Sequence, residues 1–269
     1  MLMTRLELIA QIRAKKSFLI IGLDSDAAKI PRHLLAHPDA VLAFNRQIID
    51  ATSDLCVGYK INTAFYESRG VHGWDSLAQT LDYIPSGLFR IADAKRGDIG
   101  NTSLHYAKTF FEVYPFDAMT VSPFMGEDSV RPFLEYPGKW TILLGLTSNP
   151  GSRDFQMLRI EGEEVFARVI RQAAAWGTAE NLMFVVGGTR SDQLEQVRRI
   201  VPGHFLLVPG IGYQGGDLGK IAGVGMTDSV GLLVNISRDI IYAGGGEDFA
   251  LKARVAAQDF QQQMATYLP

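Results

Sequence analysis

Charged residues of alternating sign lie close together in the stretch 93–103, whose sequence is DAKRGDIGNTS. An apolar run, 88–92, precedes this stretch, so we expect Asp93 and Lys95 at the end of a buried strand. Side chains two residues apart on a strand share a face, which places the Asp93 carboxylate beside the Lys95 ammonium. Asp98 adds a second carboxylate just before a Gly-Asn-Thr-Ser sequence typical of a helix start. A fixed cation flanked by fixed anions can stabilise a carbanion and then protonate it.

Two further charged residues, Asp24 and Lys60, end the first two apolar runs of the chain. Together with Asp93, Lys95 and Asp98 they would form a row of five charges of alternating sign. The alternative is a surface ion-pair cluster that closes a strand-to-helix turn. Removing one member of a buried network costs about 3–5 kcal/mol, because it leaves a charge unpaired. Such a network is a poor way to gain stability alone, so we favour a functional site.

A second candidate site is an anion-binding turn near the C-terminus. The segment 209–217, PGIGYQGGD, is rich in glycine, and glycines let backbone N–H groups approach an anion closely. An arginine that follows the last apolar run could bind the same anion with two hydrogen bonds. The alternative is a flexible surface loop with an unrelated arginine. The candidate residues of this site are Gly210, Gly212, Ser237 and Arg238.

Other polar residues have weaker assignments. Thr147 and Ser148 follow the fifth apolar run and offer hydroxyl groups to a polar ring, although they could equally cap a turn. Gln214, between glycines, could tip a lid that closes over a ligand, or simply face solvent. The five histidines show no metal-ligand spacing, so we expect no metal site, and Cys56 is expected in the core.

Eight short apolar runs alternate with helical segments along the chain. Continuous apolar runs are typical of strands buried on both faces, and strict alternation with helices indicates a parallel sheet. The predicted strands are 18–23, 55–61, 88–95, 118–121, 140–146, 182–186, 205–208 and 232–236. The predicted helices are 2–15, 39–52, 73–83, 102–112, 162–176, 191–200, a short one after 217, and 247–266.

Eight such units favour a closed (β/α)8 barrel with an N-terminal helix, formed by one domain over residues 1–269. An open doubly wound sheet is the alternative, but the first turn lacks the GxGxxG sequence of a dinucleotide-binding fold. Active sites of barrels lie at the C-terminal ends of the strands. The candidate residues fall at that end in this prediction, which favours one shared site.

Composition excludes several functional classes. The chain has 47% hydrophobic and 20% charged residues and a net charge of −3, without a basic patch for nucleic acid. Charged residues interrupt the apolar residues of the N-terminus, which argues against a secretory signal peptide. No apolar run is long enough for a membrane span. One cysteine allows no disulfide within the chain, which fits a reducing cytoplasm.

The sequence DAKRGDIGNT at 93–102 resembles the D-x-K-x-x-D-I-G-N-T signature of the orotidine 5'-phosphate decarboxylase family. The resemblance extends to Asp24, Lys60, the Thr147-Ser148 pair, the Pro-Gly-Ile-Gly loop and Arg238. The chain length and the Leu-Thr-Ser-Asn-Pro turn are similar to the longer bacterial branch of that family. The resemblance implies a lyase that converts orotidine 5'-monophosphate to UMP and CO2 without a cofactor, in the last step of de novo pyrimidine biosynthesis.

The resemblance also implies roles for the charged residues. Lys95 would stabilise the carbanion at C6 and deliver the proton, with Asp93 against the departing carboxylate. Lys60 would pair with Asp93 and, with Asp24, hold the ribose hydroxyls. Asp98 would reach into the neighbouring site of a homodimer whose active sites lie at the subunit interface.

For the binding residues, the resemblance implies that Thr102 also reaches into the neighbouring site. Ser148 would bind the pyrimidine, Gln214 would close over the ligand, and Arg238 would hold the phosphate.

Two other functions remain open. Sugar-phosphate decarboxylases and aldolases of the same scaffold share D-x-K-x-x-D but use Mg²⁺, with a glutamate where this chain has Lys60. A lysine cannot ligate Mg²⁺, which prefers oxygen donors. A non-catalytic barrel that binds phosphate as a sensor is the second alternative, and binding of UMP without turnover would indicate it.

Overall fold

The computed structural model describes residues 3–212 and 215–269, and within them eight parallel strands form a closed barrel. Consecutive strands along the chain are neighbours in the barrel, and the last pairs with the first, Leu19 opposite Val234. The barrel strands are β1 (Leu19–Gly22), β2 (Gly58–Asn62), β3 (Phe89–Arg96), β4 (Ala118–Val121), β5 (Trp140–Leu146), β8 (Leu182–Val186), β9 (Leu206–Pro209) and β10 (Leu232–Ile236). The predicted (β/α)8 barrel is confirmed.

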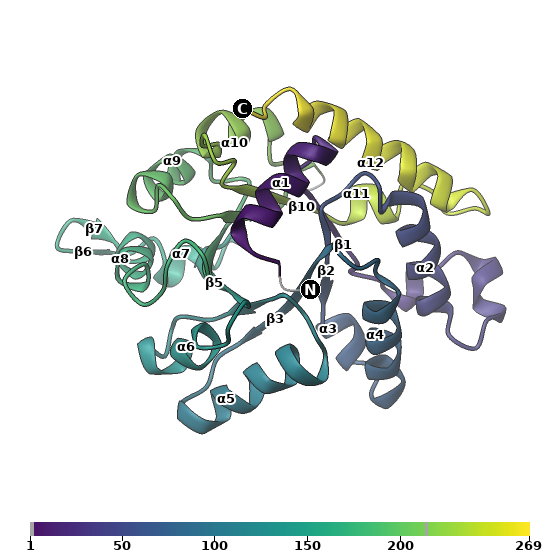
Figure 1. Ribbon diagram of the computed structural model, residues 1–269, viewed down its shortest axis with the longest axis horizontal. Coiled ribbons are helices and arrows are strands. Elements are labelled where there is room, and N and C mark those ends of the chain that lie inside the picture. Colours follow the sequence, from purple (N-terminus) through teal and green to yellow (C-terminus); the bar gives the residue numbers. More distant parts are fainter. Residues whose placement is uncertain (1–2, 213–214) are drawn as a thin grey trace.

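Helices surround the barrel as a ring (Figure 1). The longer helices are α1 (Arg5–Lys15), α2 (Ala40–Thr52), α4 (Val71–Tyr83), α5 (Gly100–Lys108), α6 (Glu127–Leu134), α8 (Val165–Ala173), α9 (Ser191–Ile200), α10 (Leu218–Gly225) and α12 (Phe249–Ala265). Short elements at strand ends and in loops are α3 (Ala64–Glu67), α7 (Ser152–Phe155), α11 (Arg238–Ile241), the 3-10 turns η1 (Ala27–Lys29) and η2 (Arg32–Ala36), and the π-helical turn η3 (Thr109–Val113). A small antiparallel hairpin, β6 (Arg159–Ile160) with β7 (Glu163–Glu164), precedes α8.

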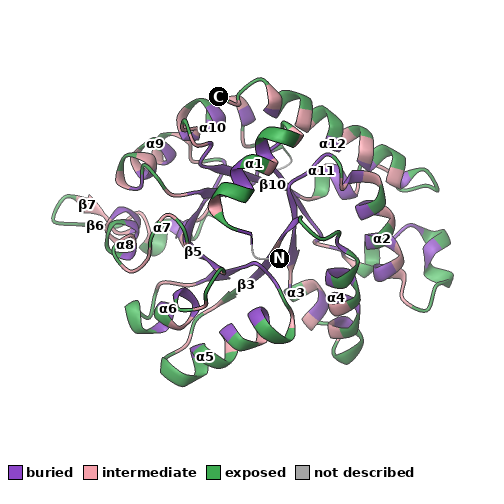
Figure 2. Ribbon diagram, in the orientation of Figure 1, coloured by how far each residue is buried: buried purple, intermediate pink, exposed green. Residues whose placement is uncertain are grey.

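The strands form the core because most of their side chains are apolar on both faces. Ile20, Phe184 and Val234 are fully buried, and Figure 2 shows buried strands inside helices whose outer faces are exposed. One face of each strand packs inside the barrel and the other packs against the helices. Among the described residues, no helix is both long and apolar enough to span a bilayer.

Helix α1 lies across the N-terminal end of the barrel (Figure 1). Thr4 caps it by a reciprocal pair of hydrogen bonds with Glu7. Its side chains reach loops that precede strands: Arg5 donates to the carbonyl of Gly203 at 2.9 Å and Arg13 to that of Asp228 at 3.0 Å. This cover leaves the opposite end, the C-terminal rim formed by the strand ends and the loops after them, as the open one.

Several boundaries differ from the sequence prediction. The predicted strand 55–61 is β2 at 58–62, and the predicted helix 102–112 is split into α5 and the π-helical turn η3. The sequence prediction named no residues for α6, a helix that contains Pro132. The predicted helix 162–176 is shorter, because residues 152–164 form α7 and the hairpin instead.

Candidate active site

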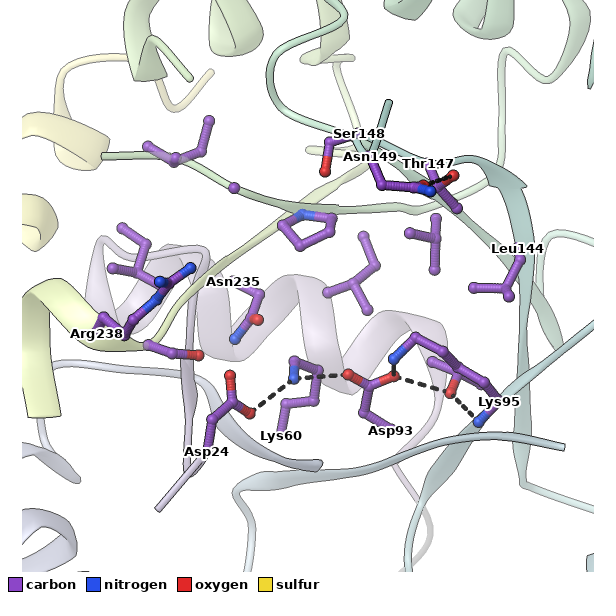
Figure 3. A pocket seen from close by; sticks show the side chains of 18 of the residues that line it. Asp24, Lys60, Asp93, Lys95, Leu144, Thr147, Ser148, Asn149, Asn235 and Arg238 are labelled. Atoms are coloured by element: carbon purple, nitrogen blue, oxygen red, sulfur yellow. Dashed lines mark hydrogen bonds and ion pairs between the residues drawn. The ribbon is translucent and has the colours of Figure 1, made fainter. Parts of the chain in front are cut away.

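The C-terminal rim brings five of the predicted charged residues together in the order of the strands. Arg238 follows β10, Asp24 follows β1, Lys60 lies on β2, and Asp93 and Lys95 lie on β3. Those four strands are consecutive neighbours around the barrel. Figure 3 shows the result, a row of charges along one wall with Arg238 near the Asp24 end.

Ion pairs connect the charged row directly. The Nζ of Lys60 lies 3.4 Å from Oδ1 of Asp24 and 2.9 Å from Oδ2 of Asp93. The Nζ of Lys95 lies 2.5 Å from Oδ1 of Asp93. Asp93 therefore binds one ammonium with each oxygen, and the row Asp24, Lys60, Asp93, Lys95 alternates in sign without a gap.

Pairing keeps the buried members of this row ionised. Burial disfavours the charged form of Asp93, but Lys60 and Lys95 outweigh it and hold the pKa of Asp93 well below its usual value. Burial likewise acts against the charge on Lys60, yet Asp24 and Asp93 raise the pKa of Lys60 above its usual value. Both groups therefore remain charged throughout the physiological pH range.

Lys95 differs from Lys60 in access and in backbone conformation. Its side chain is 48% exposed, whereas that of Lys60 is 5% exposed. Its φ of 48° lies in the left-handed region, which non-glycine residues adopt only where surrounding contacts hold them. Lys95 is thus the more accessible ammonium of the row, and its backbone is held in an unfavourable conformation.

The charged row lines a cavity of about 420 Å³. Thr147, Ser148 and Asn149 line it from the loop after β5, across from the row (Figure 3). Gln156 holds this loop, because its Oε1 accepts from the amide of Thr147 at 2.8 Å and its Nε2 donates to the hydroxyl at 2.9 Å. The predicted pair Thr147 and Ser148 therefore reaches the same cavity as the charges.

The loop after β9 contributes Gly210 to the cavity lining. Gly212 has a φ of +77°, and a Cβ there would lie 1.9 Å from Oδ2 of Asp239, so only glycine fits. The amide of Gly212 donates to the carbonyl of Gly216 at 3.2 Å. The sequence prediction expected that amide to face an anion, and here it closes the loop instead. Gln214, the predicted lid residue, lies outside the described residues.

Ser237 and Arg238, the predicted residues after β10, both line the cavity. Gly22 at the end of β1 allows this approach, since a Cβ there would lie 1.8 Å from Oγ of Ser237. Arg238 opens α11 beside Asp24 and supplies a guanidinium at the end of the cavity away from Lys95. The cavity therefore has one end suited to an anion.

Asp98 and Thr102 do not line this cavity within one chain. Asp98 is partly exposed, and its Oδ1 accepts from the amide of Ile99 at 2.8 Å. Thr102 is exposed on α5. Among the described residues, the ion pairs of the row end at Lys95, so the fifth member stays a prediction.

Sequence reasoning missed two polar residues that line the cavity from inside strands. Thr120 of β4 is 1% exposed, and Asn235 of β10 is 5% exposed and donates to the carbonyl of Ile20 at 3.1 Å. Each is a single polar residue within an apolar run, and that interruption is the feature of the sequence that could have identified it as a cavity residue. The remaining wall is apolar and includes Leu144, Val185 and Leu207. Within the described part of the chain, no group of three or more metal-ligating side chains lies together.

Fixed charges beside an apolar wall suit a reaction in which negative charge develops on carbon. The Lys95 ammonium is positioned before the reaction, so little reorganisation is needed when the charge appears. The distant guanidinium can supply binding energy that does not depend on the reacting atoms.

The chain is similar to known proteins in sequence and in fold. A family model described as "Orotidine 5'-phosphate decarboxylase / HUMPS family" matches residues 17–253. The chain is 54% identical to an orotidine 5'-phosphate decarboxylase of Bacteroides fragilis over 99% of this chain and 98% of that one. It is 56% identical to one of Porphyromonas gingivalis, over 97% and 96%. The solved structure of Leishmania donovani OMP decarboxylase has a TM-score of 0.86, with 34% identity and 98% of each chain covered.

Proposed function

Since the chain belongs to the orotidine 5'-phosphate decarboxylase / HUMPS family, we propose that it decarboxylates orotidine 5'-monophosphate to UMP and CO2. This reaction is the last step of de novo pyrimidine biosynthesis. The observation that carries the proposal is the row of paired charges, with an accessible Lys95 Nζ 2.5 Å from a buried carboxylate. A reaction that needs a stabilised carbanion and then one proton requires this combination.

The mechanism that we propose uses side chains of this chain at the reacting carbon. The bond between C6 and the carboxylate breaks, CO2 departs, and the electron pair stays on C6 as a carbanion. Lys95 stabilises that charge and donates a proton to C6, and water then reprotonates Lys95. Asp93 lies against the carboxylate before it departs, and Lys60 and Asp24 hold the ribose hydroxyls.

The other end of the nucleotide extends toward Arg238. We propose that its guanidinium binds the phosphate together with Ser237 and the backbone at Gly210, and that Gln214 closes over the ligand, while Gly212 shapes the turn between them. The hydroxyls of Thr147 and Ser148 bind the pyrimidine from the opposite wall. The order of these groups along the cavity supports this orientation, because Arg238 and Lys95 occupy opposite ends (Figure 3).

We also infer that the enzyme is a homodimer to which Asp98 and Thr102 contribute across the interface. Ile99, the residue after Asp98 in the chain, is 57% exposed, and Phe124, in the loop before α6, is 89% exposed. The loops that carry them are adjacent, because Ser103 of α5 donates to the carbonyl of Ser129 in α6 at 3.0 Å. A patch of this kind on a soluble protein supports a subunit contact.

Three further features belong to the proposal. The chain acts as one domain over residues 1–269, it works in the cytoplasm, and it needs no metal ion or cofactor. The buried, unpaired thiol of Cys56 suits a reducing compartment. Lys60 occupies a central place where a Mg²⁺-dependent relative would need an oxygen donor.

The test is turnover of orotidine 5'-monophosphate by purified protein in EDTA, followed by ultraviolet absorbance. We expect the unaltered protein to consume the nucleotide and Lys95→Ala to lose at least about 10³-fold in kcat while unfolding at a similar temperature. No turnover by the unaltered protein would refute the proposal, and UMP binding without turnover would indicate the sensor. Activity that EDTA abolishes would point to the metal-dependent relatives.

A further inference from the structure

The backbone of β3 becomes irregular where it carries the two central charges. Ala92 pairs with Met119 of β4 and Arg96 pairs with Val121, so three residues of β3 lie opposite Thr120 alone. Those three residues include Asp93 and Lys95. Thr120 is therefore the residue of the neighbouring strand that faces the irregular segment.

The hydroxyl of Thr120 contacts both charged residues. The amide of Lys95 donates to its Oγ1 at 2.9 Å, and the same hydroxyl donates to Oδ1 of Asp93 at 3.0 Å. A hydroxyl has one proton to donate and lone pairs to accept, so both hydrogen bonds can exist together. Oδ1 of Asp93 is also the oxygen that the Lys95 ammonium contacts.

This arrangement explains how an unfavourable conformation of Lys95 is maintained. With a φ of 48°, the amide of Lys95 points away from the regular ladder of the sheet. Thr120 supplies the acceptor that this amide would otherwise lack in a mostly buried site. Its hydrogen bond to Asp93 then fixes the carboxylate that the Lys95 ammonium contacts.

We propose that Thr120 is a positioning residue, whose hydroxyl fixes the Lys95 backbone and the Asp93 carboxylate so that the ammonium lies at the reacting carbon. This inference rests on the proposed decarboxylation. Thr120 acts through the two charged residues, so its loss should impair the chemical step more than the binding of the nucleotide.

The chain offers a matched control for a substitution at this site. Thr141 of the adjacent strand β5 is also fully buried, and its hydroxyl has no hydrogen-bond partner among the described residues. Thr120→Val and Thr141→Val remove the same atom from neighbouring strands of the barrel. Only the first removes hydrogen bonds to the charged row.

The experiment compares Thr120→Val, Thr120→Ser and Thr141→Val in steady-state decarboxylation and in binding of UMP. For Thr120→Val we expect kcat to fall by about 10²-fold, the size of effect that a small misplacement of reacting groups produces. Its KM and its affinity for UMP should stay within about threefold. Thr120→Ser, which keeps the hydroxyl, should recover most of kcat, and Thr141→Val should match the unaltered protein.

Three results would overturn the inference: a Thr120→Val kcat within about twofold of the unaltered protein, a serine variant no better than valine, or a parallel loss of UMP affinity. The last would indicate general damage to the cavity. If valine prevents folding, Thr120→Cys, which keeps the size but is a weak donor, must show the same loss of kcat. Turnover by the unaltered protein with no effect of Thr120→Val would refute this inference alone, whereas no turnover at all would refute the proposed function.

Discussion

Replacing Lys60 by methionine should destabilise the protein in a way that depends on pH. The Lys60 side chain is 5% exposed and contacts Asp24 at 3.4 Å and Asp93 at 2.9 Å. Loss of one partner from a buried pair costs about 3–5 kcal/mol. Asp93 keeps Lys95 and Thr120 as partners, so we expect the lower end, about 3 kcal/mol at neutral pH.

The dependence on pH follows from Asp93. Its folded-state pKa lies below the unfolded value because of Lys60 and Lys95, so its ionisation adds stability above the unfolded pKa. That contribution is lost as the pH falls through the folded-state value. In Lys60→Met the pKa of Asp93 rises, so the destabilisation should be greatest at neutral pH and should shrink below about pH 4.

The assay is urea unfolding at one fixed protein concentration, at neutral pH and at the lowest pH where both proteins stay folded. Lys15→Met is the matched control, because the Nζ of Lys15 donates to the carbonyls of Ser53 at 2.6 Å and Cys56 at 2.8 Å. Its loss leaves two neutral acceptors, which costs about 1–3 kcal/mol. This cost should change far less with pH, because Lys15 is the smallest of the causes that lower the pKa of Asp54. A loss for Lys60→Met below about 1 kcal/mol, or one that does not change with pH, would refute the reasoning.

Three shorter predictions concern other parts of the molecule. Phe124→Asp should shift the protein toward monomers in sedimentation and lower activity together with dimer content; a fully active monomer would contradict the interface. Gln156→Leu removes both hydrogen bonds to Thr147 and should raise KM by about tenfold with a smaller change in kcat, as measured by steady-state kinetics. Burial and two nearby arginines lower the pKa of His204, so the unfolded chain takes up a proton first as the pH falls below about 6.5, and stability decreases there. His204→Gln should abolish that decrease in urea unfolding between neutral and mildly acidic pH, and an unchanged slope would assign it to other groups.

Strands were predicted best where an apolar run is bounded by turn residues on both sides. The segments 118–121, 140–146, 182–186 and 232–236 form strands with the predicted bounds. Each is buried on both faces, so hydrophobicity alone defines it. The strand at 58–62 was displaced because apolar residues continue upstream into the turn that precedes it.

A helix that contains a proline and a short exposed hairpin were harder to predict than the strands. The helix at 127–134 was not predicted, and it contains a proline. The two acidic residues in its first turn, which favour a helix start, were the signal that could have indicated it. The hairpin at 159–164 exposes Ile160, and an ion pair between Arg159 and Glu164 joins its two strands. Hydrophobic periodicity predicts elements that bury one face. This hairpin buries little of its surface, so periodicity does not indicate it.

The charged row was predictable because each member interrupts the end of an apolar run. The contacts of Thr120 were not, because they depend on an irregular pairing of β3 with β4 that no local pattern specifies. The proposed roles of Asp98 and Thr102 require a second chain, and a single sequence does not show how two copies would pack together. Residue types therefore indicated the chemistry, while the precise backbone indicated which side chains support it.

The cover that α1 forms has a consequence for biosynthesis. The helix is synthesised before the barrel strands, yet Arg5 and Arg13 bind carbonyls that lie 198 and 215 positions later in the chain. The first strand likewise finds one of its two neighbours only when the last strand exists. During synthesis, α1 and β1 therefore cannot complete these contacts until residues 203–236 have left the ribosome, and their apolar side chains stay exposed for that time.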